Sequence, residues 1–326
     1  MLKLAMSPSA ATPITLADIR AAAERIRPIA RRTMVLKSHN FDREAGVATF
    51  FKCENMQKGG AFKIRGAANF IYSIPEPDRA RGVVAFSSGN HAQAVAIAAQ
   101  SLGIPATLAM PLDAPRTKVE ATRARGARIV TYDRLREDRV AVGKKLAAET
   151  GATLVPPYDH PWTIAGQGTV ALELLEEVPD LDAIVVCIGG GGLISGSAIA
   201  AKSLHPKIRM IGVEPADGND TFLSLQAGKR IEIQPPSTVA DGLRAQIPGE
   251  ITFPIMQRLV DEIVLVSEDE IRAAVKFLLT RVKILAEPSG AVSAAAVLFK
   301  KLPPGLTRVG VILSGGNVDY ELLASL

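Results

Sequence analysis

Two periodicities of apolar residues run along the chain, one typical of helices and the other of strands. Near the start, four apolar residues follow the spacing of a helix with one buried face: Ile19, Ala22, Ala23 and Ile26. Thr15 and Asp18 form a T-x-x-D capping signal in front of them, and Pro28 ends the helix. A β-branched and aromatic run then predicts a strand at 49–53.

From residue 82 onward, predicted strands and helices alternate. The predicted strands cover residues 83–86, 106–109, 127–132 and 153–155, and the predicted helices cover 92–102, 118–125 and 134–149. Parallel strands are joined by crossovers of this kind, so the alternation predicts a parallel sheet with helices on both faces.

A proline-rich stretch, with Pro156, Pro157 and Pro161, interrupts the alternation and suggests a crossing between domains. Beyond it, strands are predicted at 182–188, 208–214, 263–266 and 308–313, and helices at 169–177, 193–202, 268–282 and 289–300. We expect residues 217–251 to be mostly irregular. The sequence therefore predicts two α/β units with a cleft between them, where ligands usually bind.

Composition narrows the class of protein. The 326 residues are 48% hydrophobic and 22% charged, as in an ordinary globular protein. The net charge of +5 is spread along the chain and only 5% of the residues are aromatic, so nucleic-acid binding is not expected. Cys53 and Cys187 cannot form a disulfide framework or a four-cysteine zinc site. The apolar runs are too short for a membrane span or a secretory signal, and we expect a soluble cytoplasmic protein.

The most informative motif is a run of glycines between a predicted strand and a predicted helix: Gly189, Gly190, Gly191 and Gly192. Backbone N–H groups without neighbouring Cβ atoms, together with the positive end of a helix, make a cradle for an anion such as phosphate. A tight turn alone would need only one or two glycines. A dinucleotide site is the main rival, since Glu214 ends the next predicted strand, but the G-x-G-x-x-G spacing fails in every register.

Lys63 follows Gly59, Gly60, Ala61 and Phe62 at the entry to a predicted apolar helix. A lysine in such a place is most often a surface charge. If it is instead removed from water, its pKa falls and its amine can form a Schiff base with a carbonyl. A phosphate cradle combined with a Schiff-base lysine favours pyridoxal phosphate as the cofactor.

Two further polar motifs follow predicted strands. One lies where a strand meets a helix, and its hydroxyl and N–H groups suit a carboxylate: Ser87, Ser88, Gly89, Asn90 and His91. A plain N-cap is the alternative interpretation of that motif. The other is Ser314, which follows the last predicted strand and could face a pyridine nitrogen, although taken alone it indicates only a turn.

Together these motifs resemble those of the fold-type II pyridoxal-phosphate enzymes, and among them the branch of threonine/serine dehydratases and serine racemases. The matching stretches keep the family's order and cover nearly the whole chain: 60–66, 87–91, 165–169, 189–192, 214–215, 287–289 and 314–319. The resemblance implies an α/β fold similar to the tryptophan synthase β subunit, with two open, mostly parallel sheets flanked by helices. It also implies a large cofactor-binding domain (1–75 and 161–326) and a small substrate-binding domain (76–160).

The resemblance further implies a role for each matching residue. Lys63 would hold the cofactor and remove the α-proton of the substrate, and Ser88 would stand on the opposite face of the cofactor. Asn90 would contact the ring oxygen of the cofactor, Ser314 its pyridine nitrogen and the glycine run its phosphate. The substrate carboxylate would be held by Ser87, Ser88, Asn90 and His91.

A cation site is the last implied feature. Glu214 and Asp220, with the carbonyl of Gly218, would supply hard oxygen ligands for Mg²⁺ or Ca²⁺. On spacing alone, an acidic surface turn is the more common explanation, but racemase-type members of the family have glutamate and aspartate at these places.

Three residues depart from the resemblance. Ala61 stands where many relatives have a serine, Tyr158 where the racemase has an asparagine near the cofactor, and Arg125 where it has a tyrosine at a nucleotide-activation site. These departures argue against activation by a nucleotide and, with it, against a specifically racemase function.

From these observations we expect a pyridoxal-phosphate-dependent ammonia-lyase that converts L-threonine and L-serine to a 2-oxo acid and ammonia. Serine racemase and 3-hydroxyaspartate dehydratase are near alternatives. A non-catalytic phosphate-ligand binding protein, favoured only if Lys63 is exposed, and an NAD-dependent dehydrogenase are more distant ones. The expected partners are a small amino-acid substrate and, by analogy with the family, a second copy in a homodimer. Neither nucleic acid nor a membrane is expected as a partner.

Overall fold

Among the described residues the strands form two sheets, the larger with six strands in the order β1-β2-β10-β7-β8-β9. The computed structural model of the protein describes residues 14–87, 89–114 and 116–325. The six strands are Val35–Leu36 (β1), Ala48–Cys53 (β2), Ala183–Cys187 (β7), Arg209–Pro215 (β8), Glu262–Val266 (β9) and Arg308–Leu313 (β10). Neighbours pair in parallel, except β1 with β2. The carboxyl ends of β2, β7, β8 and β10 therefore meet at one edge of the sheet, where ligands of such folds bind.

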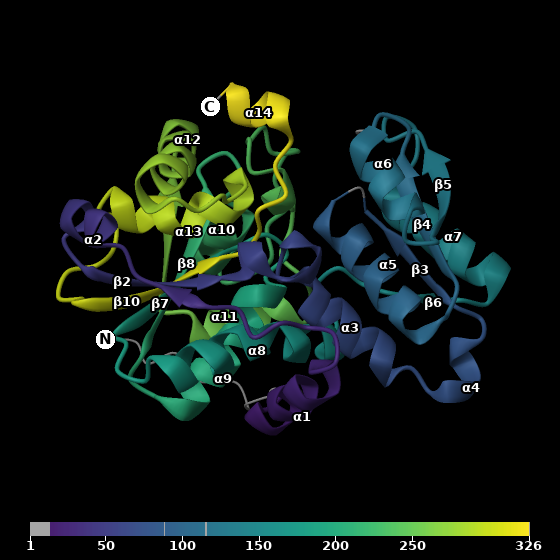
Figure 1. The fold of residues 1–326 in the computed structure, drawn as a ribbon, viewed down its shortest axis with the longest axis horizontal. Coiled ribbons are helices and arrows are strands. Elements are labelled where there is room, and N and C mark those ends of the chain that lie inside the picture. Colours follow the sequence, from purple (N-terminus) through teal and green to yellow (C-terminus); the bar gives the residue numbers. More distant parts are fainter. Residues whose placement is uncertain (1–13, 88, 115, 326) are drawn as a thin grey trace.

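Helices cover both faces of this sheet (Figure 1). One face carries Pro161–Glu177 (α8), Gly192–Leu204 (α9) and Thr252–Leu259 (α11), with Leu16–Ile26 (α1) packed on α8. The other carries His39–Ala45 (α2), Glu268–Phe277 (α12) and Pro288–Leu298 (α13). Asp220–Ala227 (α10) and Tyr320–Ala324 (α14) complete this half of the protein. A parallel sheet needs this double cover because both of its faces are apolar.

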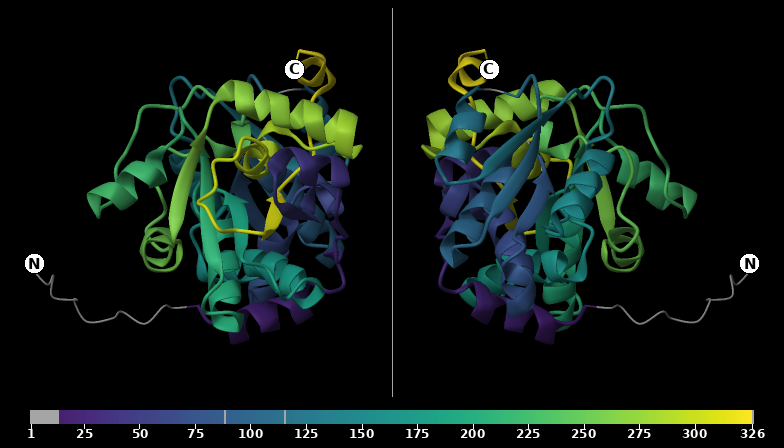
Figure 2. Two further views of the ribbon diagram at one scale, coloured as in Figure 1. Left: turned by 90° about the vertical axis from the view of Figure 1, so that its left-hand side faces the viewer. Right: turned by 90° about the vertical axis from the view of Figure 1, so that its right-hand side faces the viewer.

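The smaller sheet has four strands in the order β5-β4-β3-β6, all of them parallel. Its strands are Val83–Phe86 (β3), Ala106–Pro111 (β4), Arg128–Tyr132 (β5) and Thr153–Leu154 (β6). Its helices are Glu76–Arg79 (α4), Asn90–Leu102 (α5), Arg116–Arg123 (α6) and Arg139–Thr150 (α7). The end-on views of Figure 2 show helices on both sides of the sheets. The predicted α/β class is confirmed.

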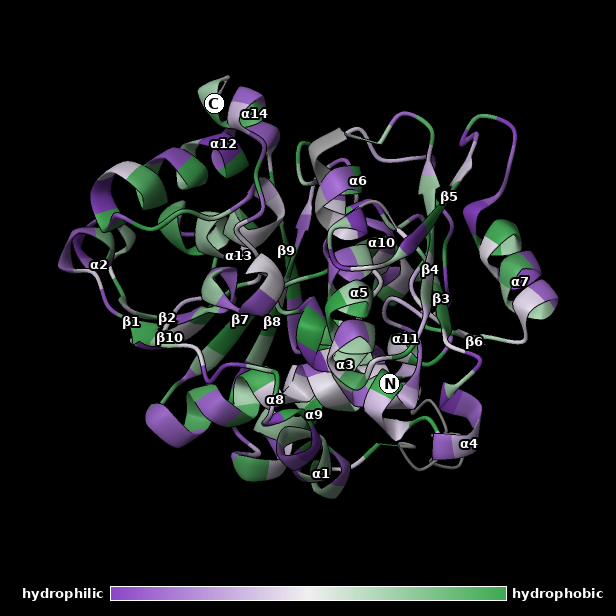
Figure 3. Cartoon of the chain, turned by 45° about the vertical axis from the view of Figure 1, so that its right-hand side comes forward, coloured by the Kyte–Doolittle hydropathy of each residue, from purple (hydrophilic) through white to green (hydrophobic). Residues whose placement is uncertain are grey.

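The buried apolar side chains form two cores, one for each sheet. Figure 3 shows hydrophobic residues concentrated along the central strands β7 and β8 of the larger sheet. The helix Lys63–Ser73 (α3) lies between the two halves, and its apolar residues Ile64, Phe70 and Ile71 pack in the smaller core. The division into domains at residues 75 and 160 stays a prediction.

Most predicted elements are present, and the N-terminal helix carries the predicted capping box between Thr15 and Asp18. Several differ from prediction, among them α7, α8, α10 and α12. Helix α7 begins at Arg139 rather than 134, because Asp133 binds the N–H of Leu135 in a turn and Asp138 caps the helix. Helix α8 begins at Pro161 rather than at residue 169, since proline is well suited to the first turn of a helix.

A third difference is α10, which lies inside the stretch predicted to be irregular. Helix α12 also ends at Phe277 and continues as a π-helical turn, Leu278–Val282. In the part of the chain that the structure describes, no helix combines the length and apolar character needed to cross a membrane.

Candidate active site

The glycine run forms the turn between β7 and α9 at the carboxyl edge of the larger sheet. Gly191 has a φ of 87°, which favours glycine. A Cβ atom on Gly190 would lie 2.3 Å from the ring of Tyr158, so only glycine fits beneath that ring. Among the described residues, none accepts a hydrogen bond from the backbone N–H of Gly189, Gly190 or Gly191. These donors, beside the N-terminus of α9, suit an anion.

Lys63 is the first residue of α3 and faces the same edge. Its Nζ donates a hydrogen bond to the carbonyl oxygen of Pro157, 2.8 Å away. The preceding residues are tied to the end of β10, because the N–H of Phe62 binds the carbonyl of Ser314 and Ala61 bridges to Gly315. Burial lowers the pKa of the Lys63 amine to about 8 from 10.5. Lys63 is therefore a half-buried amine that loses its proton more easily than that of an exposed lysine.

Ser314 lies directly after β10 and is 3% exposed. The thiol of Cys187, at the end of the neighbouring strand β7, donates a hydrogen bond to its Oγ at 3.3 Å. Ser314 Oγ also lies 3.5 Å from the carbonyl oxygen of Ser289, at the outer limit for a hydrogen bond. Burial raises the pKa of the Cys187 thiol, so the thiol remains protonated and acts as a donor.

Asn90, the first residue of α5, links the smaller half of the protein to the larger. Its Nδ2 donates to Oε1 of Glu287 at 2.6 Å, and its Oδ1 accepts from Nδ2 of Asn317 at 2.8 Å. Asn317 also binds the carbonyl of Gly59. Because Nδ2 of Asn90 carries a second hydrogen, it can still donate to a ligand. Glu287 and Asn317 also line a pocket of about 190 Å³.

The rest of the motif around Asn90 is described in part. Ser88 lies outside the described residues. Ser87 is half-buried and its Oγ accepts from the N–H of Gly89 at 3.2 Å. The imidazole of His91 turns inward, with Nε2 3.0 Å from the carbonyl oxygen of Val155, and burial together with the charge of Lys63 lowers its pKa to about 3. A contact from His91 to a substrate would therefore use its backbone N–H at the start of α5.

Glu214 and Asp220 are fully buried, which excludes the acidic surface turn. The carboxylate of Glu214 accepts hydrogen bonds from the N–H groups of Thr221 and Phe222, at 3.1 and 2.8 Å. Both carboxylate oxygens of Asp220 are buried and lack a hydrogen-bond partner in the described structure. Burial raises the pKa of Glu214 to about 8, helped by the charge of Asp220, and burial raises the pKa of Asp220 to about 7.

An uncompensated buried carboxylate is costly unless a cation binds it, and an oxygen-only donor set suits Mg²⁺ or Ca²⁺. Among the described residues no cluster of three or more His, Cys, Asp or Glu side chains could hold a metal. A cation here would therefore depend on Glu214, Asp220 and a backbone carbonyl such as that of Gly218.

The residues at the carboxyl edge fit pyridoxal phosphate. Three groups that the cofactor requires converge there: the unpaired N–H groups of the glycine run for its phosphate, the amine of Lys63 for its aldehyde, and a hydroxyl at Ser314 for its ring nitrogen. Contacts of neighbouring residues bring these groups together: the N–H of Phe62, next to Lys63, binds the carbonyl of Ser314, and Lys63 binds the carbonyl of Pro157, whose neighbour Tyr158 packs on Gly190.

Sequence reasoning missed several residues of this site. Glu287 and Asn317 lie within matched motifs but received no role, and only their contacts with Asn90 reveal one. Cys187 lies two residues before the glycine run. Its position at the end of a predicted strand could have indicated that it lies at the ligand-binding edge of the sheet. Tyr158 was noted only as a departure, whereas it packs on Gly190.

Comparison with known proteins gives consistent matches. The family described as "Pyridoxal-phosphate dependent enzyme" matches residues 26–315. A serine racemase of Schizosaccharomyces pombe is 48% identical over 94% of this chain and 95% of its own length. An L-threo-3-hydroxyaspartate ammonia-lyase of Saccharomyces cerevisiae is 49% identical over 96% of both chains. The structure of maize serine racemase superposes with a TM-score of 0.92, at 45% identity and 96% coverage of both chains.

Proposed function

Because the chain belongs to the pyridoxal-phosphate dependent enzyme family, we propose that it is an ammonia-lyase acting on L-threonine and L-serine. The β-hydroxyl leaves as water, and hydrolysis of the resulting enamine takes up one water and releases ammonia and a 2-oxo acid. The observation that carries the proposal is the half-buried amine of Lys63, with a lowered pKa, at the edge that holds the glycine run. A binding protein for a phosphate ligand would have no use for such an amine.

Lys63 has two tasks in this proposal. Its amine attaches the cofactor, and it then takes the α-proton of the substrate as a general base. Pyridoxal phosphate supplies the withdrawal of electrons from the α-carbon when bound. A base with a pKa near the working pH is the most effective, and the value of about 8 meets this requirement.

The start of α5 binds the substrate carboxylate. Ser87 offers a hydroxyl, and Asn90 and His91 offer backbone N–H groups at the positive end of the helix. Asn90 is held by Glu287 and Asn317, so this end of α5 is positioned against the larger sheet. Ser88 lies outside the described residues; from the family resemblance we propose it as the group that would return a proton in racemisation.

Elimination is favoured over racemisation by the residue at the ring nitrogen. Ser314 is a hydroxyl and does not force protonation of the pyridine, as a carboxylate would. With Ser314 as its partner, the cofactor would withdraw electrons from the α-carbon less strongly than with a carboxylate, which would favour early loss of the β-hydroxyl. The balance between the two outcomes is a difference of a few kcal/mol in barrier height.

Racemisation of serine and elimination from L-threo-3-hydroxyaspartate are the second candidates, since the named relatives carry these activities. A substrate with a second carboxylate needs a cation. Burial raises the pKa of the Tyr158 phenol, whose ring covers Gly190, and the positive charges of Arg139 and, to a smaller extent, Arg230 oppose this effect. Arg139 is thus a candidate for that cation.

We further propose that Glu214, Asp220 and the carbonyl of Gly218 bind Mg²⁺ or Ca²⁺. The unpartnered oxygens of buried Asp220 support this assignment. The cation would neutralise two adjacent buried acids and so stabilise the turn between β8 and α10.

We also propose that the enzyme is a homodimer. Met34, Met56 and Leu285 are 49%, 45% and 38% exposed, and their segments are connected through hydrogen bonds of Cys53 and Asn55. Such a group of exposed apolar side chains suits a protein interface. Light scattering of the wild type and of Met56→Glu would test it, with a dimer expected only for the wild type.

A substrate panel tests the proposed activity. The holoenzyme is incubated with L-threonine, L-serine, D-serine and L-threo-3-hydroxyaspartate, and 2-oxo acid formation and the chirality of the remaining amino acid are measured. We expect 2-oxo acid from L-threonine and L-serine. A product that is mainly D-serine would assign a racemase instead, and activity confined to hydroxyaspartate would assign that lyase. If activity is confined to hydroxyaspartate, Arg139→Ala should raise the KM for this substrate more than it lowers kcat.

A further inference from the structure

A cluster of four charged side chains, three of them buried and Glu173 half-buried, lies behind Lys63: Lys52, Glu54, Arg65 and Glu173. We call it the ion cluster. The guanidinium of Arg65 forms a two-bond fork with Glu54, at 2.8 Å for each bond, and a second fork with Glu173, at 2.7 and 2.8 Å. Lys52 donates to Glu173 at 2.6 Å. The two positive and two negative charges balance.

The ion cluster connects α3 to the larger half of the protein. The apolar side chains of α3 pack in the smaller core. The partners of Arg65, in contrast, come from the end of β2 and from α8, which belong to the larger core. Although burial alone would raise the pKa of Glu54, the Arg65 guanidinium holds it below its ordinary value, so the carboxylate stays charged. Charged side chains therefore contribute to the attachment of α3 to the half that holds the glycine run.

Because Arg65 lies on α3 close to Lys63, its ion pairs also affect the direction in which Lys63 projects. Residues two apart on a helix point about 200° from one another, so Arg65 and Lys63 leave α3 on nearly opposite sides. Each guanidinium fork is planar and allows little rotation. When Arg65 is held between Glu54 and Glu173, the rotation of α3 about its axis is set, and with it the direction in which Lys63 projects.

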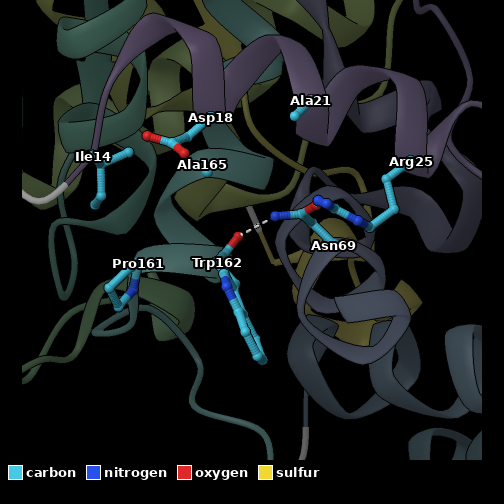
Figure 4. Close-up of a pocket in the computed structure, with 8 residues that line it drawn as sticks. All are labelled: Ile14, Asp18, Ala21, Arg25, Asn69, Pro161, Trp162 and Ala165. Atoms are coloured by element: carbon cyan, nitrogen blue, oxygen red, sulfur yellow. Dashed lines mark hydrogen bonds between the residues drawn. The ribbon is translucent and has the colours of Figure 1, made fainter. Parts of the chain in front are cut away.

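Two further contacts fix the position of α3 against α8. A Cβ atom on Gly166 would lie 2.5 Å from the carbonyl oxygen of Arg65, so α3 and α8 are in direct backbone contact. One helical turn beyond Arg65, Asn69 donates to the carbonyl of Trp162 at 2.6 Å and accepts from Arg25 at 2.6 Å (Figure 4). The first two turns of α3 are thus anchored on the side that faces away from Lys63.

We propose that Arg65, Glu54 and Glu173 are positioning residues that aim the amine of Lys63 at the cofactor. This inference rests on the proposed function, because it assumes that Lys63 is the attachment point. Stability alone is a poor explanation for the ion cluster, since buried ion pairs contribute little more than apolar side chains of equal volume. Apolar side chains in place of Arg65, Glu54 and Glu173 would lack the paired hydrogen bonds that fix the orientation of α3.

The test compares Arg65→Lys and Glu173→Gln with a control, Ile271→Val. Lysine keeps the charge of Arg65 but loses both forks, and glutamine keeps the shape of Glu173 but loses its charge. Ile271 is a buried residue of α12 in the larger core, so its truncation lowers stability without touching the ion cluster. For each protein the melting temperature, the dissociation constant of pyridoxal phosphate and the visible circular dichroism of the saturated holoenzyme are measured.

A second readout does not need the cofactor. Apoprotein is pulse-labelled with acetic anhydride across a pH series, and acetylation of Lys63 is followed by peptide mass. The titratable groups that act on Lys63 are the Cys187 thiol and the His91 imidazole, and all three proteins retain both. If Lys63 turned toward water, the pH at which its acetylation is half-maximal would lie closer to 10.5 than to about 8.

We expect both ion-cluster variants to bind the cofactor at least tenfold more weakly, to lose visible dichroism and to shift the labelling midpoint upward. Ile271→Val should change only the melting temperature. The inference is overturned if the variants keep wild-type dichroism and labelling, or if Ile271→Val reproduces their changes. Should Arg65→Lys fail to fold, Glu173→Gln decides alone. A wild type that binds no pyridoxal phosphate would refute the proposed function, while the labelling series would still decide the role of Arg65.

Discussion

The thiol of Cys187 donates its hydrogen to the hydroxyl of Ser314, with Sγ and Oγ 3.3 Å apart. The two residues end neighbouring parallel strands, β7 and β10. Because the thiol occupies an acceptor position on Ser314 Oγ, the hydroxyl proton of Ser314 is directed elsewhere. In the structure the Ser314 hydroxyl donates to the carbonyl oxygen of Ser289 at 3.5 Å. In the proposed enzyme it would turn to the pyridine nitrogen, and the pair would then keep Ser314 a donor and the ring nitrogen unprotonated.

Replacing the thiol should therefore weaken cofactor binding slightly. We expect Cys187→Ala to raise the dissociation constant of pyridoxal phosphate about threefold, the effect of losing one weak hydrogen bond of about 0.6 kcal/mol. Cys187→Ser keeps a donor and should bind like the wild type. Titration of the apoenzymes by absorbance measures both. Equal affinity of the alanine and serine variants, at any level, would contradict a role for the hydrogen bond.

The close contact between Gly190 and Tyr158 leads to a second prediction. A Cβ atom on Gly190 would lie 2.3 Å from the ring, so Gly190→Ala must displace either Tyr158 or the glycine turn. We expect at least a tenfold loss of cofactor affinity, with phosphate-free pyridoxal less affected. Combining Gly190→Ala with Tyr158→Ala should recover part of the loss, a coupling that a double-mutant cycle measures. Strictly additive effects would show that the ring does not constrain the turn.

Cation binding at Glu214 and Asp220 predicts a change in stability that does not depend on catalysis. Adding Mg²⁺ or Ca²⁺ to chelator-treated protein should raise the melting temperature by roughly 5 °C at about a hundred times the dissociation constant. Asp220→Asn should lose this response. Asp217→Asn changes an exposed acid of the same turn and is the matched control. If the wild type melts at the same temperature with chelator and with added cation, the proposed cation site at Glu214 and Asp220 is wrong.

Much of the fold follows from the sequence because its strands are short apolar runs and its helices carry strong local signals. Thr15 and Asp18 form the capping box that their spacing predicts. Local signals failed where one residue type suits two structures. Pro161 can end a helix or begin one, and the structure uses it to begin α8. Helix α10 lies among Gly and Asp residues that are typical of loops, and its acid Asp220 is buried.

The sequence predicts the parts of the candidate site in which a single motif indicates the chemistry. The glycine run and Lys63 carry such signals. The sequence does not predict contacts between residues on distant elements. The contact of Asn90 with Glu287 joins residues 197 positions apart, and no local pattern reports it. The same holds for Arg65, whose charge would normally indicate a surface residue but which is fully buried between Glu54 and Glu173.

The lowered pKa of Lys63 makes cofactor attachment dependent on pH. Attachment needs the neutral amine, which a pKa of about 8 makes available two to three pH units below an ordinary lysine at 10.5. The rate at which apoenzyme binds pyridoxal phosphate covalently should thus rise between about pH 7 and 9 and then level off. Lys58→Ala removes an exposed lysine from the same loop and should leave this profile unchanged. A rate that still rises steeply above pH 9 would indicate a solvated amine.

The most direct measurement is to find where the cofactor is attached. Holoenzyme is reduced with borohydride, digested and mapped by mass spectrometry, with Lys63→Ala treated in the same way. We predict that the reduced cofactor is found on the peptide containing Lys63, and that the alanine variant carries no stable label and has lost its absorbance band. A label on another lysine, or a wild type that carries none after loading with pyridoxal phosphate, would contradict the assignment of Lys63.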